Sequence, residues 1–136
     1  MEECALTYRH SLFTDHPEWL ILEAEFALTP GDPAAIKAKM DELAQKRRSK
    51  QPLDLPSAGS TFKRPEGHFA AALIEQCGLK GVGVGGAQVS EKHAGFVVNR
   101  GGATADDVRR LMELIQNTVL RETGIALEPE VKFLGF

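Results

Sequence analysis

The spacing of apolar residues in the N-terminal third of the chain predicts a strand followed by a helix. Apolar and polar residues alternate over 20–28, with two glutamates on the polar face, which is the pattern of a half-buried strand. Asp32 and Pro33 then suit the N-cap and the first helical position. The predicted helix ends in the cations of 46–50, and its apolar positions are Ile36, Met40, Leu43 and Ala44.

Two further helices are predicted after a polar segment, residues 51–65, that is rich in proline, serine and glycine. The shorter helix spans about 67–77, ends at a glycine, and has Phe69, Leu73 and Cys77 on its core side. The longer one starts at Thr104 with a pattern that resembles a capping box, and closes at Gly124. Its apolar positions at helical spacing are Val108, Leu111, Met112, Ile115 and Val119.

Short strands are predicted over 95–99, 126–127 and 131–134. Because strands and helices alternate irregularly, the fold class is α+β. We expect a small mixed or antiparallel sheet packed with about three helices.

Composition indicates an ordinary globular domain. The chain has 136 residues, of which 43% are hydrophobic and 26% charged. Its net charge of −3 argues against a generally basic surface for nucleic acid or anionic membranes. The acidic N-terminus is unlike a signal peptide, and Cys4 and Cys77 lack a CxxC spacing. We therefore expect a cytoplasmic protein that binds neither nucleic acid nor a membrane.

The glycine-rich run Gly81–Gly86 formally satisfies GxGxxG, the dinucleotide-binding pattern. That pattern requires a strand before it and a helix after it, whereas here a helix precedes and a strand is expected to follow. A tight connection between elements is therefore the favoured interpretation.

Other polar residues leave alternatives open. Ser60 has no GxSxG motif around it, so a turn serine is favoured over a nucleophile, and a role in anion binding or proton transfer stays open. The four histidines show no metal-binding spacing, so no metal site is predicted. Glu128 and Glu130 are either exposed turn carboxylates or members of a site.

Several segments, taken in order, carry a further signal. They are Tyr8–Phe13, Pro56–Pro65 (PSAGSTFKRP), Gly78–Gly81, Gly85–Asn99 (GGAQVSEKHAGFVVN) and Leu127–Val131 (LEPEV). In order and spacing the chain resembles the C-terminal portion of the UDP-N-acetylenolpyruvoylglucosamine reductase (MurB) family of flavoenzymes. The resemblance extends along nearly the whole chain.

The resemblance implies a reaction of peptidoglycan precursor synthesis. In that reaction UDP-N-acetylglucosamine enolpyruvate becomes UDP-N-acetylmuramate, with FAD and NADPH as cofactors. It implies Ser60 as the proton donor, with Glu130 and Arg9 on the substrate carboxylate, where charge develops. It also implies contacts to the UDP-sugar; the residues expected to contribute are Lys80, His93, Arg64, Lys63 and Lys132.

The same resemblance predicts the division into domains. Residues 1–28 would be the last stretch of an FAD-binding domain and 29–136 the substrate-binding domain. The other FAD-binding regions of the family have no counterpart here, so we expect the chain to need a separate FAD-binding domain as its partner. Two alternatives are a stand-alone UDP-sugar-binding module, and a non-functional fragment that self-associates through the exposed strand around 19–26.

Overall fold

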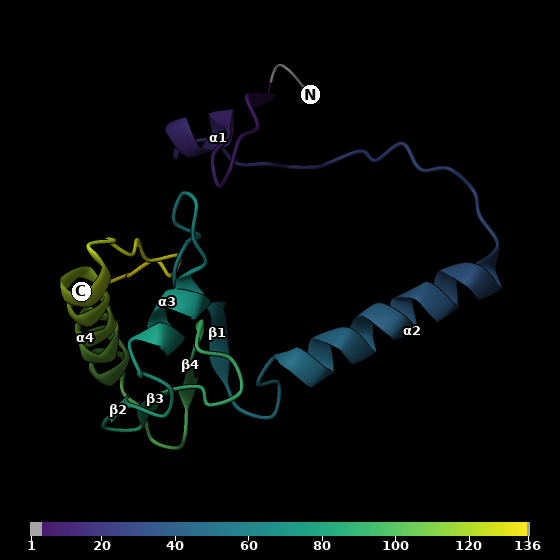
Figure 1. Ribbon diagram of the computed structural model, residues 1–136. Coiled ribbons are helices and arrows are strands. Elements are labelled where there is room, and N and C mark those ends of the chain that lie inside the picture. The colour runs from purple at the N-terminus through teal and green to yellow at the C-terminus, as the bar shows by residue number, and fades with distance from the viewer. Residues whose placement is uncertain (1–3, 136) are drawn as a thin grey trace. The chain divides into compact units, whose positions relative to one another are not determined.

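The computed structural model describes residues 4–135 and divides into two units, one ending at Ile36 and the other starting at Lys37 (Figure 1). In the N-terminal unit, the short helix α1 (Leu12–Asp15) follows an isolated bridge between Thr7 and His10. The strand predicted over 20–28 is wrong. Its residues form no strand, and Leu20, Leu22 and Leu28 are each more than 80% exposed. Alternation alone does not make a strand when no neighbouring strand bonds to it within the described residues.

Helix α2 (Pro33–Lys50) confirms the predicted helix and its start. An Asp32 carboxylate oxygen accepts a hydrogen bond from the Ala35 amide at 3.0 Å, as an N-cap does. None of the helix is buried, so its apolar positions form no core stripe in this structure. Ion pairs line its surface instead, and those from Lys46 and Lys39 lower the pKa of Glu42.

The C-terminal unit contains a four-stranded antiparallel sheet in the order β1-β4-β3-β2 (Figure 1). Strand β4 (Phe96–Asn99) confirms the strand predicted over 95–99. Strands β2 (Gly83–Val84) and β3 (Ala87–Val89) form a hairpin, so the glycine-rich run is the tight connection that was favoured. Strand β1 (Ser57–Ser60) lies inside the polar segment 51–65, for which no strand was predicted.

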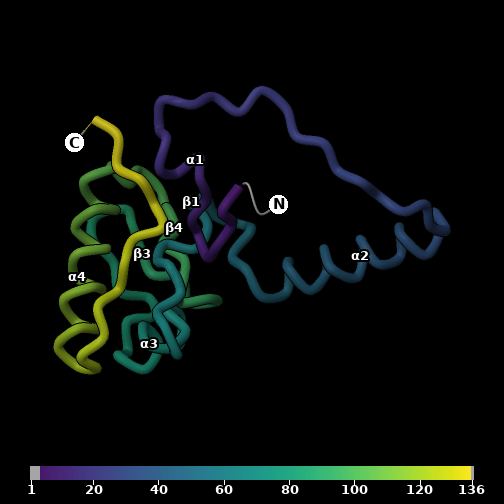
Figure 2. The backbone as a smooth tube through the Cα atoms, turned by 90° about the horizontal axis from the view of Figure 1, so that it is seen from above, coloured from purple at the N-terminus to yellow at the C-terminus, as the bar shows by residue number. Residues whose placement is uncertain are grey.

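The predicted C-terminal strands over 126–127 and 131–134 are absent from the described structure. The segment makes one isolated bridge, between Pro129 and Phe62. It returns alongside α4 (Figure 2), where the Gln116 side-chain amide donates to the Leu127 carbonyl at 2.8 Å. This side-chain bond adds to the short backbone pairing of the segment with residues 61–63.

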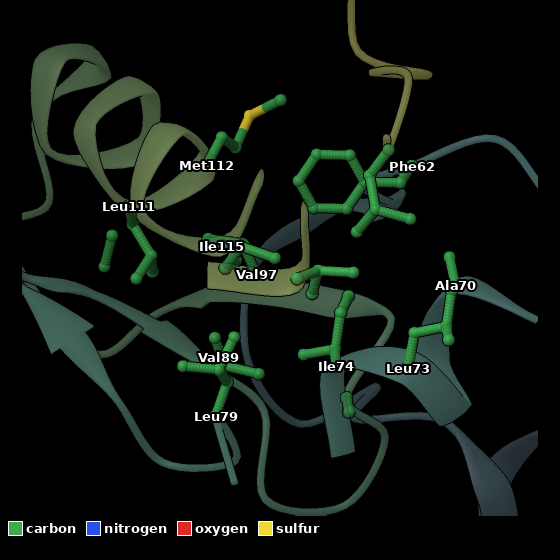
Figure 3. Close-up of a cluster of buried hydrophobic side chains, with 14 residues drawn as sticks. Phe62, Ala70, Leu73, Ile74, Leu79, Val89, Val97, Leu111, Met112 and Ile115 are labelled. Carbon is green, nitrogen blue, oxygen red and sulfur yellow. The ribbon is translucent and has the colours of Figure 1, made fainter. Parts of the chain in front are cut away.

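The core lies between the sheet and two helices, α3 (Ala70–Gln76) and α4 (Ala105–Thr123). Leu111, Met112 and Ile115 of α4 lie on one side of this core in Figure 3, with Val89 and Val97 of the sheet across from them. These side chains are at most 7% exposed. Burial of these apolar groups accounts for most of the driving force for folding of the unit. The core also contains Phe62, Leu73, Ile74, Leu79 and Leu127.

Phe69 departs from the core position predicted for it. It is 59% exposed and precedes α3 as its N-cap residue, while Cys77 packs partly buried against the core. Within the described residues, no helix combines the length and the apolar character that a membrane span requires.

The N-terminus of α4 is joined to the β2–β3 turn. Thr104 and Asp107 form the predicted capping box, with bonds of 2.9 and 3.1 Å between each side chain and the other's amide. Asp107 also accepts a bond from the Gly86 amide. A Cβ on Gly86 would lie 2.4 Å from the Ala103 nitrogen and 2.5 Å from the Gly101 carbonyl oxygen. Glycine is therefore required here by the close approach of two backbone segments.

We predict that Gly86→Ala lowers the free energy of unfolding by about 3 kcal/mol, the upper end of overpacking costs, because the atoms in the way are backbone. Urea unfolding of the full chain measures the effect. Ala105→Ser also adds one heavy atom, at an exposed position nearby, and should stay within about 0.5 kcal/mol of the parent. Equal effects of the two substitutions would contradict the packing argument.

A pH dependence follows from the same cap. Hydrogen bonds from Thr104 hold the pKa of Asp107 below its usual range. A carboxyl with a lower pKa in the folded state stabilises fully above its unfolded pKa and loses that effect as the pH falls through its folded value. The parent should therefore melt higher than Asp107→Asn at neutral pH, and the gap should close between about pH 5 and pH 2. A gap in melting temperature that is constant with pH would rule out this linkage.

Candidate functional site

Thr61 connects three segments of the C-terminal unit. Its amide donates to the Gly95 carbonyl at 2.9 Å, and its hydroxyl oxygen accepts from the Val97 amide at 3.0 Å. Its carbonyl accepts from the Glu130 amide at 2.9 Å. The residue is only 3% exposed, so these bonds form away from solvent. Ser60, which precedes Thr61, and Glu130 are thereby held on adjoining segments.

A second set of contacts extends this pairing by two residues. The Lys63 amide donates to the Glu128 carbonyl at 2.8 Å, on the other side of the bridge between Phe62 and Pro129. The Lys63 ammonium also forms an ion pair with the Glu128 carboxylate. The two residues are 65 positions apart, and no local spacing in the sequence points to their contact. This antiparallel pair of segments, 60–63 with 128–130, is called the site ribbon below.

His93 lies beside the site ribbon, in the loop between β3 and β4. Its Nδ1 accepts a hydrogen bond from the Gly95 amide at 3.1 Å, and its ring meets the Phe96 ring edge-on at 5.0 Å between centroids. With Nδ1 as acceptor, a neutral His93 carries its proton on Nε2. The Nε2 atom can therefore donate a hydrogen bond.

Two cationic candidates flank α3, at opposite ends of a helix roughly 10 Å long. Arg64 donates from Nε to the His68 carbonyl at 3.3 Å, and its guanidinium lies 4.0 Å from the centroid of the Phe69 ring. That stacking explains why the exposed Phe69 is held in place. Lys80, at the other end, donates to the Glu75 carboxylate at 2.6 Å.

The remaining two candidates are less closely placed. Lys132 is exposed and follows Glu130 by two residues. Arg9 belongs to the N-terminal unit, where its guanidinium lies 5.2 Å from the centroid of the Tyr8 ring. The structure therefore brings Ser60, Lys63 and Glu130 together, with His93 alongside.

An apolar groove of about 350 Å³ adjoins the site ribbon. Residues of strands β1 and β4 form much of its wall together with Thr61, and Val108 of α4 also lines it. Its remaining lining residues are Pro56, Ser57, Ala58, Val97, Val98, Asn99 and Val131. A groove with this lining is suited to the apolar part of a ligand. Ser60 precedes Thr61 in the chain and is not one of the lining residues.

Within the described residues, the glycine-rich turn that resembles a dinucleotide-binding motif does not have room for the phosphates of a flavin cofactor. Asp107 and the backbone of Ala103 fill the space that a phosphate would need next to Gly85 and Gly86. No helix N-terminus follows the turn directly, since β3 does. Among residues 4–135, no group of three or more His, Cys, Asp or Glu side chains is arranged to hold a metal ion.

Comparison with known proteins identifies similar sequences and a similar fold. Residues 51–134 match the model of a family described as UDP-N-acetylenolpyruvoylglucosamine reductase, C-terminal domain. The chain is similar to the reductases of that name from Exiguobacterium sibiricum, at 56% identity, and Caldanaerobacter subterraneus, at 52%. Each alignment covers 98% of this chain and 44% of the relative.

A solved structure of the MurB reductase from Thermus caldophilus superposes with a TM-score of 0.78 at 34% identity. The alignment covers 96% of this chain and 46% of that one. The chain thus spans less than half the length of the proteins that it matches. The α+β class predicted above is confirmed by this fold.

We predict that Thr61→Val lowers the free energy of unfolding by about 1–3 kcal/mol, because the buried Val97 amide then has no acceptor. Thr61→Ser keeps the hydroxyl and serves as the matched control, and its cost should be the smaller of the two. Urea unfolding followed by far-ultraviolet circular dichroism measures the stability of the C-terminal unit. Tryptophan fluorescence would not, because Trp19 belongs to the N-terminal unit. If the serine variant is the less stable, the hydroxyl is not what holds the segments together.

Proposed function

Because this chain belongs to the UDP-N-acetylenolpyruvoylglucosamine reductase family through its C-terminal domain, we propose that it binds the sugar-nucleotide substrate and donates the proton. The proposed reaction adds a hydride and a proton across the double bond of the enolpyruvyl ether, which gives UDP-N-acetylmuramate. The observation that carries the proposal is the site ribbon, which holds Ser60 and Glu130 on adjoining segments through the bonds of Thr61.

Ser60 is proposed as the proton donor. It is exposed at the end of β1, so its hydroxyl is accessible to a ligand from solvent. A serine hydroxyl is a weak acid, so a nearby positive charge is needed to stabilise the alkoxide that it leaves. Lys63, three residues on, is proposed to supply that charge, and its ion pair with Glu128 restricts where its ammonium lies.

Glu130 is proposed to act at the substrate carboxylate, together with Arg9. Negative charge develops on that group when hydride adds to the neighbouring carbon, so a cation and an acid stabilise it. The hydrogen bond from the Glu130 amide to the Thr61 carbonyl fixes the backbone of Glu130, and this limits the positions that its carboxyl group can reach. Lys132 is proposed to add positive charge close to Glu130.

Lys80, His93 and Arg64 are proposed to contact the UDP-sugar. The Lys80 ammonium suits a diphosphate, and binding would exchange its exposed partner Glu75 for the ligand. The His93 ring, whose Nδ1 accepts from the Gly95 amide, is proposed to donate from Nε2 to a sugar or phosphate oxygen. Arg64 presents a guanidinium already oriented by its stacking on Phe69.

The cofactors FAD and NADPH supply the hydride in the proposed reaction, and we assign no described residue of this chain to hold them. Residues 1–28 are proposed to belong with the FAD-binding domain and residues 29–136 to form the substrate-binding domain, in the cytoplasm. The exposure of Leu20, Leu22 and Leu28 supports this division, since apolar side chains left in solvent favour a further domain that covers them.

A second candidate function is a stand-alone sugar-nucleotide-binding module. It is favoured by one observation: the site ribbon, His93, Arg64 and Lys80 are all held by contacts within the C-terminal unit. This candidate predicts substrate binding without turnover after an FAD-binding domain is supplied. Turnover of the substrate after the chain is mixed with an FAD-binding domain would exclude this second candidate function.

Calorimetric titration of the full chain with UDP-N-acetylglucosamine enolpyruvate, with UDP as the reference ligand, tests the proposed function. We predict tighter binding of the substrate than of UDP, and a loss of about 1–3 kcal/mol of binding free energy in Lys80→Ala from a missing charge-assisted bond. Lys37→Ala removes an ion-paired lysine on α2 and should leave the affinity unchanged.

Ser60→Ala provides the contrast, because a proton donor contributes to the reaction and not to ground-state binding. Its affinity should match the parent's. A folded parent chain that releases no heat with either ligand would refute the proposed binding role.

A further inference from the structure

Strand β1 contains a β-bulge directly before Ser60. Ser57 pairs with Val98 and Ser60 pairs with Phe96, so three steps along β1 match two steps along β4. One extra residue in one strand of an antiparallel pair defines such a bulge. Gly59 lies within it at a φ of 86°, in the left-handed region that favours glycine.

The bulge decides which face of the strand carries Ser60. Side chains alternate between the two faces of a sheet, so an insertion of one residue moves every following side chain to the other face. Beyond the bulge, the bonds of Thr61 to Gly95 and Val97 hold the shifted register. The extra residue and the anchor after it therefore act together.

Space is not the reason for a glycine at this position. A Cβ built on Gly59 meets no atom within 4 Å, so only the backbone conformation disfavours an L side chain. We propose that Gly59 is a positioning residue, whose bulge presents the Ser60 hydroxyl on the face of β1 where the substrate lies. The inference rests on the proposed function, since it assumes that Ser60 acts on that substrate.

The test places a thiol at the position of the serine by Ser60→Cys, in a full chain that also carries Cys4→Ser and Cys77→Ala. Alkylation by iodoacetamide is timed with and without UDP-N-acetylglucosamine enolpyruvate, and the affinity is measured in parallel. The four backgrounds compared have Gly59 unchanged, Gly59→Ala, Gly59→Asn and Gly102→Ala. Asparagine tolerates a positive φ better than alanine does. Gly102 has a φ of 67° with no atom near its Cβ, in the turn before α4, so its substitution strains the backbone away from Ser60.

We expect the substrate to slow alkylation of the thiol about tenfold when Gly59 is unchanged, and equally in Gly59→Asn and Gly102→Ala. In Gly59→Ala the substrate should slow alkylation less than about twofold. The affinity of Gly59→Ala for the substrate should stay near the parent's. A role in stability alone would affect Gly59→Ala and Gly102→Ala alike. Full protection of the thiol in Gly59→Ala would overturn the inference.

Nuclear Overhauser contacts between residues 60 and 96 separate failure of this inference from failure of the proposed function. They are measured in the chain with Ser60 intact and without substrate. We expect them to be lost in Gly59→Ala and kept in Gly102→Ala. If no background binds substrate, the proposed function fails, and contacts that persist in Gly59→Ala overturn the inference on their own.

Discussion

The hydrogen bonds of Thr61 are the constraint on which the candidate site depends. The segments that it joins, around residues 60, 96 and 130, lie far apart along the chain, and the one around residue 130 has no regular secondary structure. In water such bonds would exchange with solvent at little net cost, whereas a buried amide without an acceptor is costly. Because Thr61 is buried, the arrangement that satisfies all three bonds is strongly preferred over any in which the segments separate.

Stability and site geometry come from different parts of the C-terminal unit. The apolar face of α4 packs over β2 and β3, whereas β1 at the edge of the sheet carries only small and polar side chains. The edge strand contributes little apolar burial, and that leaves its end accessible to a ligand. The packed core under α4 thus supports the exposed edge strand β1. Binding sites are commonly built at the exposed edge of such a packed structure.

Local signals in the sequence predicted the helices well, because caps and periodicity involve residues within one or two turns. The Thr104 and Asp107 capping box is such a signal. Strands depend on partners that local patterns do not reveal: 20–28 alternates without being paired, and Ser57–Ser60 is paired without alternating. For the site, residue chemistry favoured a turn serine at Ser60 and left proton transfer open, and the resemblance is what implied the role of proton donor. The contact between Lys63 and Glu128 has no local signal at all.

The location of the hydrogen bonds that fix the site residues explains how substrate binding and reduction can be proposed to depend on different parts of the protein. The backbone and side-chain hydrogen bonds described above for the site ribbon, His93 and Lys80 are formed within the C-terminal unit. The proposed recognition of a sugar nucleotide requires only that these groups keep their positions, whereas the proposed hydride transfer also requires a second reactant at a defined distance from the reacting carbon. A chain that spans less than half of its relatives can therefore keep the first property while it depends on other residues for the second.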